Sequence, residues 1–487
     1  MPDAKNADMT MALRKPLTIL LGAALALGAC GKDDAGPVRA VVIGQSMKIA
    51  DPTAKGSLQP ADAVLHGAAA EGLVRFDAGG QIVPGLAERW NVSDDGLSYI
   101  FRLGDRRWSD GTRVTARFVV RRLRAAAAPQ SRNPLAMVLS GIEEIVATTD
   151  DVLEIRLTAP RPNLLYHLAS PELAVVRDDG GAGPFAVERR ADDSLLLSRT
   201  IPDGEGERRE SLALRTARSA VAVTLFTQRQ ADLVLGGTWG DLPVARAADP
   251  RAAALRLDPA AGFFGLAVVG PGGPLKSAEV RRAISMALDR DAIVAAMAIQ
   301  GLQPRATLAP ADLSNLAAPA APSWAPAPLA LRQAEARRLI TTPVRLRVAL
   351  PDGPGYTLLF AHLKRDWAVI GVEAERVAMP GNADLRLLDA VAPSRGASWY
   401  FEQFTCERAA VCDATADAAI ESARIARDAP TRANYFAEAD RQLADAAIFI
   451  PLTAPVRWSL VAPRINGFRP NPFAVHNLTD LLEVRRR

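Results

Sequence analysis

Two Asp-Gly dipeptides near the start of this chain of 487 residues predict antiparallel structure there. Asp95-Gly96 separates the apolar runs 90–93 and 97–103, and Asp110-Gly111 follows shortly afterwards. A turn of this composition between alternating apolar runs is the strongest local signal for a β-hairpin. The sequence therefore predicts at least one hairpin in this region.

Elsewhere, predicted strands and helices alternate, which favours a layered α/β fold. Residues 306–329 are rich in Ala and Pro and predict an extended surface connection. At roughly 100–200 residues per domain, two or three domains are expected. The predicted strands span 38–45, 343–350 and 449–452, and the predicted helices span 61–74, 114–128, 358–370, 416–427 and 432–447.

The charge balance excludes a nucleic-acid partner. The chain has 58 basic and 54 acidic residues, a net charge of +4, and only the tail 485–487 is a run of arginines. Nucleic-acid binding needs a concentrated basic patch. With 49% hydrophobic residues, the composition also excludes bulk disorder.

The N-terminus predicts export. Arg14-Lys15 precede the apolar run 17–27, which is too short for a membrane span of about 20 residues and fits a secretory signal. The small residues that end in Cys30 resemble a bacterial lipoprotein signal, which implies a signal peptide over 1–29, a lipidated Cys30 and a tether over 30–37. The alternative is an ordinary secretory signal in which Cys30 is incidental.

If Cys30 carries lipid, Cys406 and Cys412 remain. An exported compartment permits a disulfide between them, and closing so short a loop would stabilise the fold by about 2 kcal/mol. No His or further Cys lies nearby, so a metal site is not expected there.

Catalytic motifs are absent from the sequence. None of its four histidines belongs to H-E-x-x-H, and no G-x-S-x-G occurs. The Gly-rich stretch 270–277 lacks the glycine that a phosphate loop needs directly before Lys276. We therefore expect no enzyme activity and no cofactor, with an exported hydrolase as the alternative.

Residues 73–120 resemble the signature region of family 5 of the extracellular solute-binding proteins, which serve peptide-type ABC importers. The family's acidic pair is replaced here by Arg117-Phe118, and Ala182 stands in place of a threonine in a later turn. The matching positions are Leu73, Asp77, Gly79, Pro84, Leu86, Ala87, Trp90, Asp95, Gly96, Trp108, Asp110, Gly111, Thr115 and Ala116.

A second segment, 274–291, also resembles this family. Its apolar positions follow helical spacing and predict one buried face, with Arg281, Arg282 and Arg290 outside that face. The matching positions are Val280, Arg281, Ala283, Ala287, Asp289 and Arg290.

The resemblance implies an α/β, two-lobe periplasmic-binding-protein-like fold of type II, in its three-domain peptide-binding subtype, with a hinge between the lobes. Lobe I would comprise 38–51, 166–260 and 453–487. A small domain over 52–165 would be inserted in it, and lobe II would comprise 261–452.

The implied function is that of a monomeric substrate-binding component of an ABC importer. It would capture a peptide or related solute outside the cytoplasmic membrane and deliver it by hinge closure to the permease and ATPase subunits. A sensor or chaperone built on the same fold is an alternative.

Candidate ligand contacts are aromatic residues beside small residues on loops, namely Trp239, Trp399 and Tyr400. Ordinary loop packing is the alternative for each. The resemblance also implies an acidic anchor for a peptide's amino group, and Asp389 and Glu402 are the candidates.

Replacing the cysteine at the end of the signal tests the lipid anchor. Cys30→Ser should abolish labelling of the protein by a radioactive or clickable fatty acid in cells, because no thiol would remain at the acylation position. The exported protein should still fold. Labelling that persists in the variant would contradict the assignment.

Overall fold

The computed structural model describes residues 36–482 except for 46, 50, 52, 54, 55, 178, 179, 191, 193, 205, 252, 253, 271 and 317. The predicted signal peptide and the lipidation site Cys30 lie outside the described residues. The chain divides into the units 1–36 and 37–487, and the second unit contains all the elements below.

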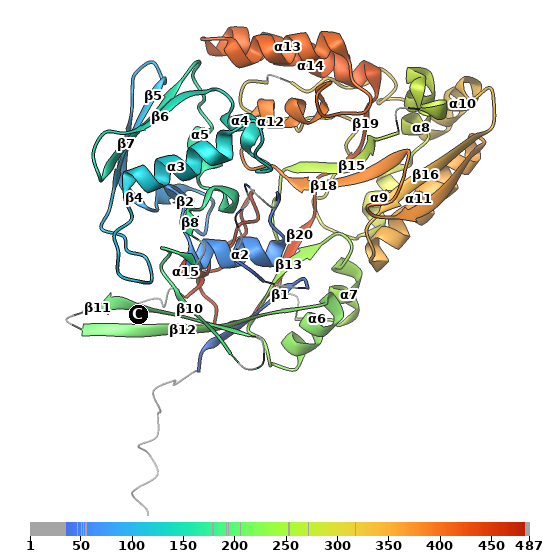
Figure 1. The fold of residues 1–487 in the computed structure, drawn as a ribbon. Coiled ribbons are helices and arrows are strands. Elements are labelled where there is room, and N and C mark those ends of the chain that lie inside the picture. The colour runs from blue at the N-terminus through green and yellow to red at the C-terminus, as the bar shows by residue number, and fades with distance from the viewer. Residues whose placement is uncertain are drawn as a thin grey trace, which may run out of the picture. The chain divides into compact units, whose positions relative to one another are not determined.

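A seven-stranded sheet forms the framework of the first lobe (Figure 1). β1 lies parallel to both β12 and β13, and the other pairings are antiparallel. In order across the sheet the strands are β10 (Ala186–Arg189), β11 (Leu195–Asp203), β12 (Gly206–Ala217), β1 (Val38–Ile43), β13 (Leu233–Thr238), β20 (Arg457–Val461) and β14 (Leu255–Leu257). The helices of this lobe are α2 (Pro60–Ala69), α6 (Ser219–Thr227), α7 (Leu242–Ala247) and α15 (Leu478–Leu481).

The small domain contains a four-stranded antiparallel sheet with α3 (Ala116–Ala127) packed on it. The predicted hairpin at Asp95-Gly96 is confirmed, because the strands on either side of it pair antiparallel. In order the strands are β4 (Ala87–Val92), β5 (Ser98–Leu103), β7 (Val152–Leu157) and β6 (Ile142–Ala147). Around them lie β2 (Val74–Phe76), β3 (Ile82–Pro84), α4 (Ala136–Leu139), α5 (Leu164–Leu168), η1 (Pro171–Leu173), β8 (Val176–Arg177) and β9 (Gly180–Gly181).

A five-stranded mixed sheet forms the second lobe, which also carries most of the long helices (Figure 1). In order its strands are β17 (Val372–Ala378), β16 (Val344–Leu350), β18 (Leu385–Val391), β15 (Gly262–Val268) and β19 (Phe449–Thr453). Its helices are η2 (Gly273–Lys276), α8 (Ala278–Met286), α9 (Arg290–Ala296), α10 (Leu329–Leu339), α11 (Pro354–Val369), α12 (Ala397–Phe401), η3 (Glu402–Phe404), α13 (Ala414–Ile425) and α14 (Ala429–Ala446).

The chain passes between the two large sheets twice. Strands β14 and β15 belong to different sheets, and so do β19 and β20. The crossing segments are therefore 258–261 and 454–456. Helix α2 packs in the core of the first lobe, and the first residue in the core of the small domain is Leu73. By packing, the boundary between the first lobe and the small domain therefore lies after α2, later than the predicted position 52.

Two buried arginines correct the sequence analysis. Arg281 and Arg290 were expected outside the buried face, yet only 5% and 4% of each is exposed. Arg290 donates to the backbone oxygens of Ser285 and Pro451, and Arg281 donates to that of Ala446. A guanidinium has five donors, and backbone carbonyls from neighbouring segments can satisfy them inside a protein.

The Ala- and Pro-rich segment 306–329 is also more buried than predicted. Its described residues up to Pro328 form no helix or strand, but four of its apolar residues enter the core of the second lobe. The four residues are Leu308, Ala309, Leu313 and Leu316.

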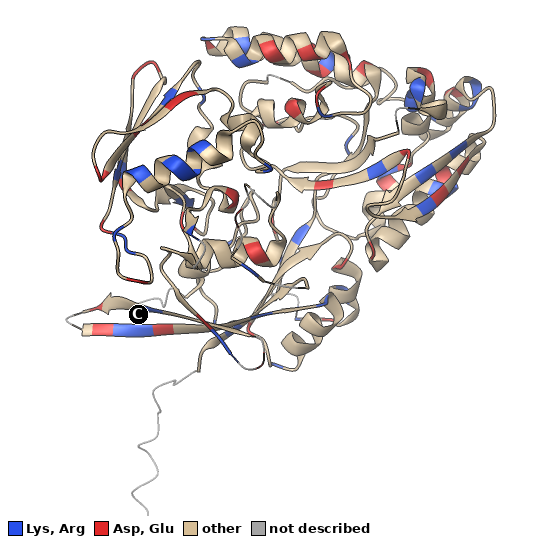
Figure 2. Ribbon diagram, viewed as in Figure 1, with Lys and Arg blue, Asp and Glu red and all other residues tan. Residues whose placement is uncertain are grey.

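Acidic and basic residues are interspersed along the ribbon (Figure 2).

Phe263 tests this core. Its ring is fully buried and lies 4.9 Å from Trp399 and 5.0 Å from Tyr400, measured between ring centroids. Phe263→Ala should lower the free energy of unfolding by about 3–5 kcal/mol in urea denaturation, because it leaves a cavity among aromatic rings. Ile425→Ala is the control, since 63% of Ile425 is exposed, and it should change little. Equal effects of the two would contradict this packing.

Candidate functional site

Trp239 lies between the two lobes and is 1% exposed. Its indole N–H donates to the backbone oxygen of Gly355 at 3.1 Å, and its ring packs on Phe264 at 4.5 Å between centroids. Gly355 has to be glycine here, because a Cβ on it would lie 2.1 Å from the backbone oxygen of Trp239. In this structure Trp239 is thus a contact between β13 of the first lobe and the second lobe.

Trp399 and Tyr400 lie on α12, where both are packed against protein. Trp399 is 9% exposed and stacks on Phe263, while Tyr400 is fully buried. The Tyr400 hydroxyl has no hydrogen-bond partner among the described residues, although Arg305 lies near enough to act on it electrostatically. Burial raises the pKa of Tyr400, so the hydroxyl is a neutral donor without an acceptor.

Asp389 is held by protein groups at both carboxylate oxygens. Oδ1 accepts from Arg457 at 2.7 Å, and Oδ2 accepts from the Tyr356 hydroxyl at 2.9 Å. Arg457 belongs to β20 of the first lobe and Asp389 to β18 of the second, so the ion pair connects the lobes. Both oxygens already accept from protein donors, so neither is free to anchor a ligand's ammonium group.

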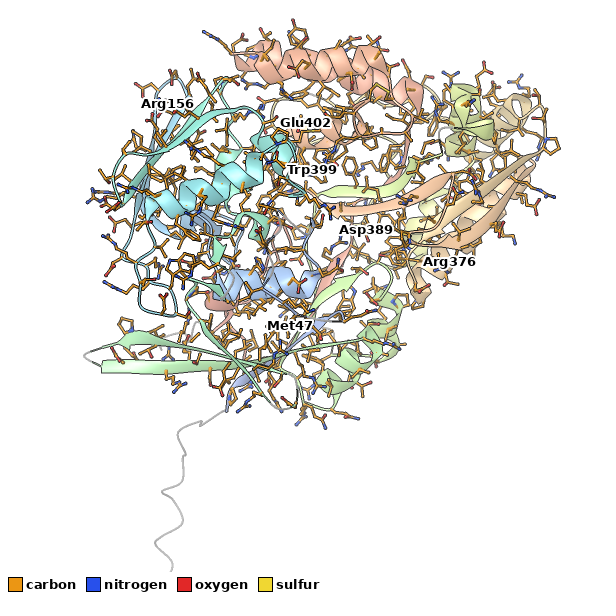
Figure 3. All side chains as sticks on the ribbon, in the orientation of Figure 1. Met47, Arg156, Arg376, Asp389, Trp399 and Glu402 are labelled. Atoms are coloured by element: carbon orange, nitrogen blue, oxygen red, sulfur yellow. A yellow bond between two sulfur atoms is a disulfide. The ribbon has the colours of Figure 1, made fainter. Side chains whose placement is uncertain are left out.

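Glu402 is the candidate with no such partner. It begins η3 directly after α12 and is 2% exposed (Figure 3). Within the described part of the chain, neither of its carboxylate oxygens has a hydrogen-bond donor. Burial raises the pKa of Glu402 to about 7, and the positive charges of Arg161, Arg424 and Arg408 limit that rise. A carboxylate without a donor is costly to bury, which makes this part of the fold unusual.

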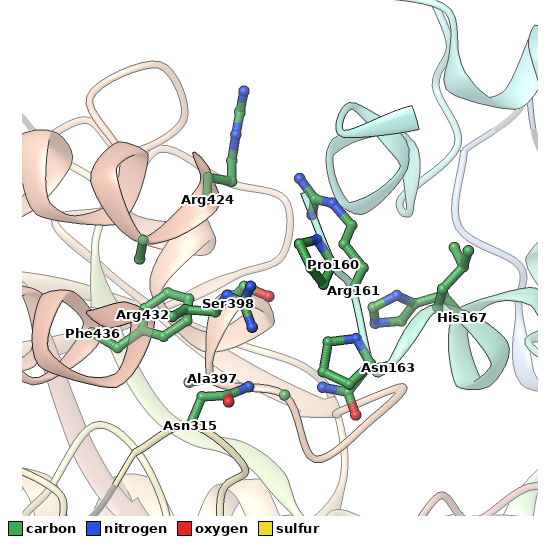
Figure 4. A pocket seen from close by; sticks show the side chains of 14 residues that line it. Pro160, Arg161, Asn163, His167, Asn315, Ala397, Ser398, Arg424, Arg432 and Phe436 are labelled. Atoms are coloured by element: carbon green, nitrogen blue, oxygen red, sulfur yellow. The ribbon is translucent and has the colours of Figure 1, made fainter. Parts of the chain in front are cut away.

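Near Glu402, a pocket lies between the small domain and the second lobe (Figure 4). Arg161, Asn163 and His167 line one side, and Arg432 and Phe436 line the other. The cavity is about 40 Å³, and its mouth is open to solvent. The sequence analysis did not select these residues. The one available signal was Arg161 between two prolines, shortly after the end of β7.

Hydrogen bonds join the small domain to the second lobe beside this pocket. His167 Nε2 lies 3.1 Å from Ser394 Oγ, and the Asn163 side chain donates to Ser314 at 3.3 Å. Burial, with a smaller effect of Arg161, lowers the pKa of His167 to about 4. The imidazole is therefore neutral at physiological pH.

A disulfide joins Cys406 and Cys412 after η3, with the two Cα atoms 5.0 Å apart. The backbone N–H of Cys406 also donates to the Asp417 carboxylate, which ties this loop to α13. In the described part of the chain, no group of three or more His, Cys, Asp and Glu side chains could hold a metal ion. Nor does any helix among those residues have the length and apolarity to cross a bilayer.

Glu402 generates a pH-dependent prediction. Its pKa is raised from about 4.3 in an unfolded chain to about 7, so its contribution to stability is present at low pH and is lost as the pH rises through 7. Glu402→Gln should therefore be more stable than the parent at pH 8 by up to about 3 kcal/mol, with the difference vanishing towards pH 4.5.

Urea denaturation between pH 4.5 and 8 measures this difference. Glu407→Gln is the control, because Glu407 follows in the same loop and is exposed, and it should match the parent throughout. A constant difference between Glu402→Gln and the parent across this range would show that Glu402 does not titrate as described.

The proteins that are similar to this chain include two relatives and one solved structure. The "probable di/tripeptide-binding protein 5" of Pseudomonas aeruginosa is 26% identical over 82% of this chain and 87% of that protein. The "probable deoxycholate-binding periplasmic protein YgiS" of Escherichia coli is 26% identical over 51% of this chain, and this match spans about half of that protein (52%). The structure of Haemophilus influenzae OppA in complex with RPPGFSPFR covers 91% of this chain and 98% of that chain, with a TM-score of 0.80 and 18% identity.

The structural match supports the α/β multi-sheet fold expected for a binding protein of this kind. The model of the "bacterial extracellular solute-binding proteins, family 5" matches residues 81–383, more than half of the chain. The family binds solutes outside the cytoplasm and is not catalytic, which removes the hydrolase alternative. The chain therefore belongs to family 5 of the bacterial extracellular solute-binding proteins, the substrate-binding components of peptide-type ABC importers.

Proposed function

We propose that this protein captures a peptide or related small solute and delivers it to the permease and ATPase subunits of an importer by hinge closure. The observation that carries this proposal is the pair of chain crossings, 258–261 and 454–456, as the only covalent links between the two large sheets in the described residues. Lobes connected in this way can rotate by changing a few backbone torsions. The names of the relatives support a solute of this size.

Two groups of contacts would act differently during closure. The Arg457–Asp389 pair and the Trp239–Gly355 hydrogen bond lie close to the crossings, where a rotation moves atoms little. The contacts of His167 and Asn163 with the second lobe lie in a different part of the chain and belong to the side that would open. The pocket beside them would open with that side and admit the solute.

The predicted ligand residues take separate roles in this proposal. Trp399, Tyr400 and Glu402 occupy one segment next to the pocket and would contact the solute or support residues that do. Trp239 and Asp389 would act as lobe contacts that determine the closed geometry, because protein groups already satisfy their polar atoms. The lobe boundaries given above and a lipid anchor at Cys30 complete the proposal. A sensor or chaperone on this fold would use the same closure without a permease.

Ligand capture is tested on protein isolated gently from the periplasm. Native mass spectrometry should detect a bound solute, because closure buries it and slows its release. After denaturation and refolding, adding that solute back should reduce the radius of gyration in small-angle X-ray scattering, whereas an unrelated sugar should not. The proposal would be contradicted if the isolated protein carried no solute and if neither peptides nor the periplasmic extract reduced its radius of gyration.

A further inference from the structure

We propose that the pocket between the small domain and the second lobe binds a carboxylate group of the solute, held by Arg161 and Arg432. This inference rests on the proposed function and adds a chemical class to it: an organic acid with an apolar body. The pocket is lined from α5 and the loop before it on one side and from α12, α13 and α14 on the other.

The first argument is charge. Three arginines line the pocket, and none of its lining residues is acidic. Arg424 is engaged by Glu421 at 3.3 Å. Arg432, which is 8% exposed, donates one hydrogen bond, to the backbone oxygen of Ala426 at 2.7 Å. Most of the donors of Arg432 are thus left for another acceptor.

Arg161 strengthens this argument. Its Nε is buried without an acceptor, and no ion pair or hydrogen bond of its guanidinium occurs among the residues described. A desolvated guanidinium without an acceptor is costly, and burial lowers its pKa accordingly. The planar guanidinium presents two parallel N–H donors that match the two oxygens of a carboxylate. An incoming carboxylate would therefore supply acceptors to Arg161 and Arg432 at once.

The remaining lining favours an organic acid over an inorganic anion. Pro160, Pro162, Leu164 and Phe436 present apolar surface beside the arginines. A phosphate or sulfate ion would leave this surface without a partner, whereas the hydrocarbon part of an organic acid would cover it. The cavity is about 40 Å³ in this structure, so such a body would enter as the small domain and the second lobe move apart.

Glu402 couples this binding to protons. The groups that act on it electrostatically are Arg161, Arg424, Arg408 and Glu421. An ionised Glu402 and the carboxylate of the ligand repel each other and are both attracted to the positive charge of Arg161. Binding of the carboxylate therefore favours the protonated form of Glu402. Affinity should rise as the pH falls from 8 to 6, a range in which His167, with its pKa of about 4, stays neutral.

The experiment compares matched acids and amides. The probes are phenylacetate, benzoate, N-acetylated amino acids and tripeptides, each paired with its carboxamide, and they are titrated into refolded, ligand-free protein by calorimetry. At least one acid should bind at least 10-fold more tightly than its amide. If no acid binds, if amides bind equally, or if inorganic phosphate binds as tightly as the best acid, the proposal is wrong.

Variants locate the binding. Arg161→Gln and Arg432→Gln should each weaken binding of the best acid at least 10-fold and leave binding of its amide unchanged. Arg156→Gln is the matched control, since Arg156 is an exposed arginine of the same small domain and should bind as the parent does (Figure 3). Glu402→Gln should bind more tightly at pH 8 and lose the pH dependence.

The thermal midpoint of each variant is measured alongside, and Arg161→Lys gives a second test if Arg161→Gln unfolds. Lysine keeps the charge and should retain more affinity than glutamine. Undiminished acid binding in folded Arg161 and Arg432 variants would overturn this site. That result would not contradict the proposed function. The proposed function fails only if no solute binds to the protein or reduces its radius of gyration.

Discussion

The ion pair between Arg457 and Asp389 fixes the two large sheets to each other where the chain crosses between them. Its nitrogen and oxygen are 2.7 Å apart, and the two side chains are only 18% and 10% exposed. Breaking a pair this buried would leave an uncompensated charge, which typically costs 3–5 kcal/mol. Tyr356 adds a second donor to Asp389, and Trp239 adds a contact to Gly355. These contacts keep the sheets close together at the crossings. In the proposed closure the lobes would therefore pivot there and separate where the contacts are single hydrogen bonds, such as that of His167 with Ser394.

Several residues that mark the family hold the fold together. Asp110 accepts from Thr112 and pairs with Arg177, which lowers the pKa of Asp110 to about 2. Asp289 caps α9, and Arg290 is enclosed by backbone carbonyls. Such residues preserve a scaffold whatever solute is bound. The arginines of the pocket lie outside the matched motif positions, so the family can be recognised from the motif while the solute cannot.

Local signals in the sequence predicted the elements well, because turns and amphipathic faces depend on near neighbours. The hairpin at Asp95-Gly96 and the helix after Thr115, whose side chain caps α3, are examples. Features set by distant partners were harder to predict. The burial of Arg281 depends on the carbonyl of Ala446, and the role of Trp239 depends on Gly355 in another lobe. Arg161 and Arg432 are 271 positions apart in the sequence and share a pocket only because the small domain meets the second lobe. Composition and periodicity do not predict this contact between the small domain and the second lobe.

Arg161 and Glu402 explain why this meeting matters. The Glu402 carboxyl and the Nε of Arg161 are buried and have no hydrogen-bond partner among the described residues. They belong to parts of the chain that a lobe moving as proposed would separate. A fold selected for stability alone would place apolar residues here, since well-packed hydrophobic groups often replace buried charges without loss of stability. Natural proteins depart from such local consistency mainly at functional sites. Under the proposed function, closing this boundary on an empty pocket would be costly, whereas closing it on a group that accepts from Arg161 would not. The unpaired groups would then make closure depend on the solute, as expected of a protein that presents only loaded molecules to a permease.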